Sequence, residues 1–151
     1  MSGGEVGAKA ASFTIMIGGP ARALRRLSLM GKNITLFASK AGADPARVRT
    51  ALMGGLANSR ILEVHGERMI KRNFDPGFRI ELHQKDLNLA LSGARALGVS
   101  LPNTATCQEL FNAAAAAGGH AWDHSGMVRV LEILANHKIG SGVTPAKAAA
   151  E

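Results

Sequence analysis

Apolar residues recur at intervals of three and four along much of this chain, and this spacing restricts its fold more than any other feature. The longest stripe consists of Leu87, Ala90, Leu91, Ala94 and Leu97. Residues at these intervals share one face of an α-helix, so the stripe predicts a helix from about Glu81 to Gly98. A shorter stripe follows Asp123 and consists of Met127, Val130, Leu131 and Leu134. The pattern is typical of helices that pack on one another.

Capping residues mark two further helices in the middle of the chain. Asp44-Pro45 is typical of an N-cap followed by the first helical residue, and Gly54-Gly55 predicts a left-handed helix end. Asn58 or Ser59 can cap the next helix, which is expected to reach Met69 and to pair charged residues along one exposed face.

The first third of the chain has a different pattern. Residues 12–19 form a short apolar and β-branched run closed by glycines, which predicts a buried strand. Residues 20–30 carry leucines at helical spacing, and Gly31 is expected to end that helix. Residues 33–37 predict a second short strand. The chain is therefore expected to begin with strand, helix and strand and to continue as helices.

The composition agrees with a mainly helical protein. Aromatic residues make up only 4% of the chain and Tyr is absent, a balance that favours helices over a β-sandwich or barrel. An alanine-rich helix is expected over residues 104–117, closed by Gly118-Gly119. The 151 residues suffice for a core without disulfides, and the single cysteine, Cys107, is expected to be a buried thiol. These features predict a cytoplasmic protein.

The net charge of +7 restricts the partners of the chain. It suits an anionic partner, but the basic residues are scattered, and no aromatic residues interleave with them as a platform for stacked bases would need. We therefore expect no nucleic acid as a partner. The segment before Gly18 is too short for a signal peptide or a membrane span, so no membrane association is expected.

Two histidines, His120 and His124, stand four residues apart, the spacing of a metal-binding pair on a helix. Gly118-Gly119 and a cap at Asp123 place His120 before the helix rather than on it. The sequence therefore predicts no metal site.

Four local patterns resemble the β-hydroxyacid dehydrogenase family. Three of them are Ser2-Gly3-Gly4 with residues 15–19, Met30-Gly31-Lys32, and Lys85-Asp86-Leu87 preceded by Phe78. The fourth consists of residues 37–44, 59–69 and 101–112, which resemble the tartronate semialdehyde (2-hydroxy-3-oxopropionate) reductase branch of that family. The resemblance covers nearly the whole chain.

The resemblance implies a fold and an activity. The implied fold is mainly α, a helical bundle of the 6-phosphogluconate dehydrogenase C-terminal-like type with a short strand-helix-strand remnant of a Rossmann domain. We expect the remnant over residues 1–36, the helical domain over 37–139 and a disordered tail over 140–151. The implied reaction is the NAD- or NADP-dependent reduction of 2-hydroxy-3-oxopropionate to glycerate. The implied partners are a small hydroxyacid and a second subunit, either identical or full-length.

The resemblance also assigns site residues. Ser2, Gly3 and Gly4 would bind the substrate together with Phe78 and Asp86, and Lys85 would contact the cofactor. The residues alone also allow plainer interpretations. These are a loose terminus for residues 2–4, a core aromatic for Phe78 and a solvated charge pair for Lys85 and Asp86.

Two parts of the family pattern are missing from this sequence. No Gly-x-Gly-x-x-Gly phosphate turn occurs in it. Leu36 runs directly into Phe37, whereas relatives have there a glycine-rich loop and a long interdomain helix with the catalytic lysine. We therefore expect no catalytic residue and no turnover by this chain alone. A helical association module is the alternative, and an unstable product of a truncated gene is a third interpretation.

Overall fold

The computed structural model describes residues 21–55 and 58–141. The α-helices in these ranges are α2 (Ala21–Lys40), α3 (Pro45–Met53), α4 (Arg60–Ile70), α5 (Ile80–Ala96), α6 (Pro102–Ala114) and α7 (Val128–Ala135). Two short helical elements precede α7, the π-helical turn η1 (Ala115–Gly119) and the 3₁₀ turn η2 (His124–Met127). The β-type pairing in the described ranges is a single bridge between Arg79 and Asp123. The expected mainly α fold is confirmed.

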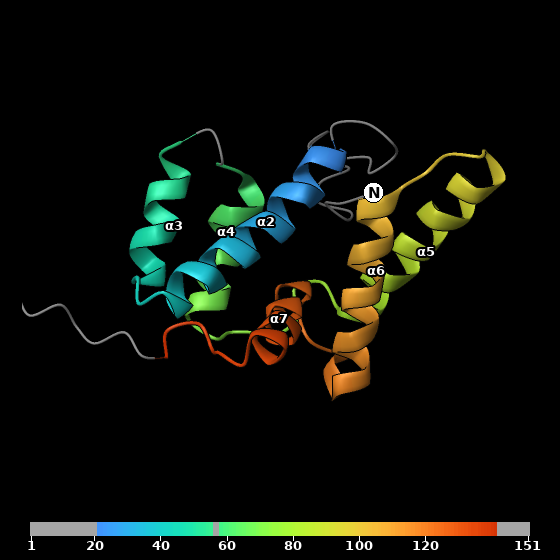
Figure 1. Ribbon diagram of the computed structural model, residues 1–151. Coiled ribbons are helices and arrows are strands. Elements are labelled where there is room, and N and C mark those ends of the chain that lie inside the picture. Colours follow the sequence, from blue (N-terminus) through green and yellow to red (C-terminus); the bar gives the residue numbers. More distant parts are fainter. Residues whose placement is uncertain (1–20, 56–57, 142–151) are drawn as a thin grey trace, which may run out of the picture.

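The helices form two groups, with α7 between them (Figure 1). On one side α2 packs against α3 and α4, and on the other side α5 and α6 lie along each other. The last helix, α7, contacts both α2 and α6. This arrangement brings the turn before α7 close to α4 and α5, although these elements are far apart in the sequence.

The core consists of two apolar clusters that the C-terminal helix joins. One cluster contains Ile80, Leu87, Cys107, Phe111, Ala114, Met127 and Val130. The other contains Leu36, Met69, Val128, Leu131 and Ile139. Because Val128 and Val130 of α7 belong to different clusters, the helix links the two halves of the bundle. The buried thiol of Cys107 is confirmed.

The predicted strand over residues 33–37 is wrong, because these residues lie inside helix α2. The buried side chains on this part of the helix are those of Lys32, Thr35, Leu36 and Ser39. They recur at the helical interval, but most of them are polar, so an apolar stripe does not reveal the helix. Gly31 was expected to end a helix, yet it lies within α2, where its position leaves room for Leu62 of α4.

The caps predicted for the middle of the chain are mostly confirmed. Asp44 accepts a hydrogen bond from the backbone N–H of Ala46, with Pro45 as the first helical residue of α3. Ser59 caps α4 by accepting from the backbone N–H of Leu62 at 3.1 Å. The left-handed end at Gly54 is wrong, since Gly54 has a right-handed φ of −76°. The charged side chains of α4 do pair along one face, with Arg60–Glu63 and Glu67–Lys71 contacts.

The stripe after Asp123 is confirmed only in part. Met127, Val130 and Leu131 are buried, but Leu134 is 73% exposed. The strand expected over residues 12–19 lies outside the described residues. The backbone N–H of Gly140 donates to the Ser39 hydroxyl at 3.0 Å, which ties the end of the described chain to α2.

Candidate functional site

Asp123 is the centre of a buried polar cluster at the junction of α4, α5 and η2. Its Oδ2 atom accepts from the Arg68 guanidinium at 2.9 Å and from the backbone N–H groups of Gly77 and Phe78 at 3.1 and 3.2 Å. Its Oδ1 atom accepts from the backbone N–H and the hydroxyl of Ser125. The carboxylate therefore holds the loop before α5 and the turn before α7 together.

The carboxyl group of Asp123 stays ionised at all ordinary pH values. Burial alone would raise its pKa, but the side chains of His65 and Ser125 and the Ser125 backbone favour the charged form more strongly. These interactions hold the pKa of Asp123 well below its usual range. A buried carboxylate with so many donors is typical of a fixed structural anchor.

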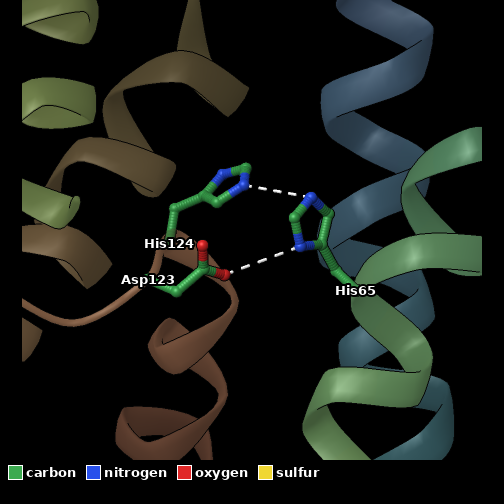
Figure 2. A group of neighbouring side chains, drawn as sticks. All are labelled: His65, Asp123 and His124. Carbon is green, nitrogen blue, oxygen red and sulfur yellow. Dashed lines mark hydrogen bonds and ion pairs between the residues drawn. The ribbon is translucent and has the colours of Figure 1, made fainter. Parts of the chain in front are cut away.

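Two histidines from distant parts of the sequence meet beside this carboxylate (Figure 2). The Nε2 atoms of His65, on α4, and His124, at the start of η2, lie 3.0 Å apart. The other ring nitrogen of His65, Nδ1, lies 3.6 Å from Oδ1 of Asp123. The pKa of His124 is lowered to about 3, chiefly by burial and also by the neighbouring His65 and His83. His124 is therefore a neutral imidazole near pH 7.

Phe78, one of the expected substrate-binding residues, borders this histidine cluster. Its ring is partly buried and makes edge contacts with the rings of His83 and His124, each with a centroid separation of 5.9 Å. The ring of His83 in turn packs on Phe111 in the core. Phe78 thus connects the polar cluster to the apolar core.

The other expected site residues on the described chain, Lys85 and Asp86, lie in the second turn of α5. Their charged atoms are 3.5 Å apart, and the Lys85 side chain is 65% exposed. Lys85 lines an open hollow of about 530 Å³ together with Glu81, Gln84, Asn88, Leu89 and Ser92. Neither Asp86 nor Phe78 lines that hollow. Ser2, Gly3 and Gly4 lie outside the described residues.

Sequence reasoning missed Lys32, His65 and Arg68. Lys32 is only 4% exposed, and burial lowers its pKa from 10.5 to about 8. Its position in an expected connection between helix and strand gave no sign of this burial. His65 meets its partner across 59 residues, a relation that no local spacing reveals. His120, the partner that local spacing suggested for His124, is exposed instead.

The fold is also found in a solved structure. The chain matches 3-hydroxyisobutyrate dehydrogenase from Salmonella typhimurium with a TM-score of 0.67 at 22% identity, over 73% of this chain and 39% of that one. The fold is therefore that of a helical domain found in hydroxyacid dehydrogenases. In addition, a family model described as "NAD-binding of NADP-dependent 3-hydroxyisobutyrate dehydrogenase" matches residues 29–131, more than half of the chain. The chain belongs to this family.

Two relatives show how much of the family pattern this chain carries. It is 54% identical to 2-hydroxy-3-oxopropionate reductase of Escherichia coli over 92% of its own length, and it spans 59% of that relative. It is 30% identical to a probable mitochondrial 3-hydroxyisobutyrate dehydrogenase-like protein of Arabidopsis thaliana, of which it spans 52%. The family to which the chain belongs uses NAD or NADP, as its description states.

The alignment with the Escherichia coli relative runs over 173 residues, although this chain has only 151. The relative therefore contains residues inside the aligned segment that have no counterpart here. The sequence predicts such a gap between Leu36 and Phe37. Helix α2 runs across that junction without a break, so the two flanking segments form one helix.

No helix in the described ranges is both long and apolar enough to cross a membrane.

Proposed function

We propose that this chain is the helical portion of an NAD(P)-dependent reductase of the 2-hydroxy-3-oxopropionate type and that it does not turn over by itself. The observation that carries the proposal is the 54% identity to the Escherichia coli reductase, combined with an alignment longer than this chain. High identity supports the substrate class. We place the missing internal residues between Leu36 and Phe37, where the family resemblance implies the segment with the catalytic lysine.

Neither lysine of α2 with a described side chain can replace the missing acid. Reduction of an aldehyde delivers a hydride to carbon and leaves negative charge on oxygen, and a positioned acid that protonates this oxygen contributes about 10²–10⁴-fold. Lys32 is buried between helices, so a substrate cannot reach its ammonium group. The ammonium group of Lys40 donates to the carbonyl of Ala135 at 2.6 Å, at the far end of α2.

Among the described residues, we propose only the hollow beside Lys85 as a place for part of a dinucleotide. The hollow beside Lys85 is open and offers this one cation, together with neutral polar groups and Glu81. The sequence has no Gly-x-Gly-x-x-Gly turn to hold a pyrophosphate at a helix N-terminus. We also propose that the hydroxyacid is bound by Ser2, Gly3, Gly4, Phe78 and Asp86. Lys85 would contact the cofactor.

Oxidation of NADH or NADPH, followed by the loss of absorbance at 340 nm, tests the proposal. Purified chain is mixed with 2-hydroxy-3-oxopropionate, and the full-length Escherichia coli relative serves as the positive control. We expect a rate at the level of the blank with either cofactor. A steady rate proportional to the concentration of the chain would contradict the proposal.

A second candidate function is association through exposed apolar side chains. Phe37 on α2 is 77% exposed, and Ile133 and Leu134 on α7 are 68% and 73% exposed. Large exposed apolar side chains favour contact with another subunit, either a second copy or a full-length reductase. We expect a dimer by light scattering at micromolar concentration and a shift towards monomer in Leu134→Ser. A wild-type monomer would contradict this function.

A further inference from the structure

We propose that His65 and His124 form a binding site for a transition-metal cation of the Zn²⁺, Ni²⁺ or Cu²⁺ class, with Asp123 orienting the His65 ring. The site is independent of the reductase function proposed above. It also departs from the expectation that the chain has no metal site. Local spacing suggests only His120 as a partner of His124, whereas the fold places His65 beside His124.

The separation of the two ring nitrogens suits a shared metal ion. The Nε2 atoms of His65 and His124 lie 3.0 Å apart. Imidazole nitrogens bind such ions at about 2.0–2.1 Å. Two of them in neighbouring coordination positions therefore lie about 2.9 Å apart at a right angle and about 3.3 Å apart at a tetrahedral angle. An ion could therefore enter with little movement of either helix.

The two Nε2 atoms share a hydrogen bond in this structure, and the orientation of the rings also allows an ion in its place. The ring centroids are only 4.2 Å apart and the rings are inclined by 80°. If the Nε2 atoms faced each other head-on, both ring centroids would lie behind them and would be much farther apart than the nitrogens. The centroid distance exceeds the 3.0 Å between the nitrogens only slightly, so the rings meet at an angle. Figure 2 shows the two rings meeting at an angle, with Nε2 of each at the side nearest the other ring. Lone pairs that meet at an angle can converge on one ion.

Asp123 supplies the outer support that a metal-bound histidine usually has. Its Oδ1 atom lies 3.6 Å from Nδ1 of His65, and Nδ1 makes no regular hydrogen bond in the described chain. A proton on Nδ1 facing the carboxylate leaves the lone pair of Nε2 for the metal, and such outer partners typically change metal affinity about 10–100-fold. A carboxylate oxygen of Asp123 lies within 4.8 Å of a ring nitrogen of each histidine. Because Oδ1 already accepts two hydrogen bonds from Ser125, we assign the carboxylate the supporting role.

The charges around the cluster decide which class of cation fits. Arg68 pairs with Asp123, and Lys32 is close enough to interact electrostatically with the same carboxylate. These cations offset the negative charge that Ca²⁺ or Mg²⁺ would require. Neutral imidazoles suit Zn²⁺, Ni²⁺ and Cu²⁺ instead. The His65 side chain is 14% exposed, and water would have to supply the remaining ligands.

Calorimetric titration of the full chain without a histidine tag, using ZnCl₂ in a buffer without chelators, tests the proposal. The variants His65→Gln and His124→Gln each remove one ligand, and His120→Gln is the matched control because His120 is exposed and outside the cluster. We expect one equivalent of Zn²⁺ for wild type and for His120→Gln. Each ligand variant should bind at least about tenfold more weakly, a difference of about 1.4 kcal/mol. Equal affinity in wild type and both ligand variants would overturn the proposal.

A spectroscopic measurement on the wild-type chain keeps the proposal testable if a ligand variant unfolds. Electron paramagnetic resonance of the chain with one equivalent of CuSO₄ should show splitting from two imidazole nitrogens, unchanged in His120→Gln. A spectrum of free Cu²⁺, or one that loses a nitrogen in His120→Gln, would overturn the proposal.

Discussion

The guanidinium of Arg68 on α4 lies 2.9 Å from Oδ2 of Asp123, an ion pair that joins α4 to the turn before α7. The same carboxylate oxygen accepts the backbone N–H groups of Gly77 and Phe78, so one side chain fixes both a helix and a loop. The chain from 74 to 80 is held in place further by backbone hydrogen bonds to Asp123 and its neighbours.

Replacing Asp123 with Ala should destabilise the protein strongly. The change leaves Arg68 and the two backbone donors without their acceptor, and breaking a buried ion pair from one side costs about 3–5 kcal/mol. The free energy of unfolding in urea measures this loss. Asp75→Ala is the control, because the exposed Asp75 accepts only through its backbone carbonyl among the described contacts. Equal losses in both variants would contradict the anchoring role of Asp123.

Gly119→Ala should also destabilise the chain, whereas Gly93→Ala should stabilise it. A Cβ atom at position 119 would lie 2.6 Å from the carbonyl oxygen of Ala114 and would overlap the Trp122 ring. At position 93, in the last turn of α5, a Cβ atom meets nothing within 4 Å, and Ala is favoured over Gly in a helix by up to about 1 kcal/mol. Thermal melts of the two variants should shift in opposite directions. A loss of stability in Gly93→Ala would show that α5 is not a regular helix there.

Lys32→Met should raise the stability at neutral pH. The pKa of Lys32 falls from 10.5 to about 8 on burial, although Cys107 and Asp123 act in the opposite direction. One pKa unit corresponds to about 1.4 kcal/mol, so the buried ammonium costs about 3 kcal/mol below pH 8. Between pH 8 and pH 10.5 the unfolded chain holds a proton that the folded chain has lost, so the stability of the wild type rises with pH.

The advantage of Lys32→Met should therefore shrink as the pH rises from 8 to 10.5. Urea unfolding at pH 7 and pH 10 measures this difference, with Lys138→Met as the control for removing an exposed charge. A gain that stays constant with pH would mean that Lys32 does not titrate in this range.

The sequence predicts the helices that bury apolar residues and that have side-chain caps. The helix α5 and the caps at Asp44 and Ser59 follow from local patterns, because a local pattern suffices to form them. The local pattern does not predict the end of α2 as a helix, because its buried face carries Lys32 and two hydroxyl residues. Thr35 donates to the carbonyl of Gly31 within the same helix, and the partners of Ser39 are His137 and Gly140, which follow α7.

The candidate site was predictable only in part for a similar reason. Phe78, Lys85 and Asp86 were identified through resemblance to a family, not through a pattern that their own spacing displays. The cluster of Asp123, His65 and His124 depends on the packing of α4 against η2, across more than fifty residues. Such a juxtaposition is a property of the fold, and no local periodicity encodes it.

Thermal unfolding by circular dichroism, with and without NADPH and a tartronate-like acid, tests most directly whether this chain keeps the fold without a working site. We expect a cooperative loss of helix at a midpoint that the ligands leave unchanged, because a ligand that binds only the folded state would raise it. A midpoint that rises with ligand concentration would show that the site still assembles and would contradict the account.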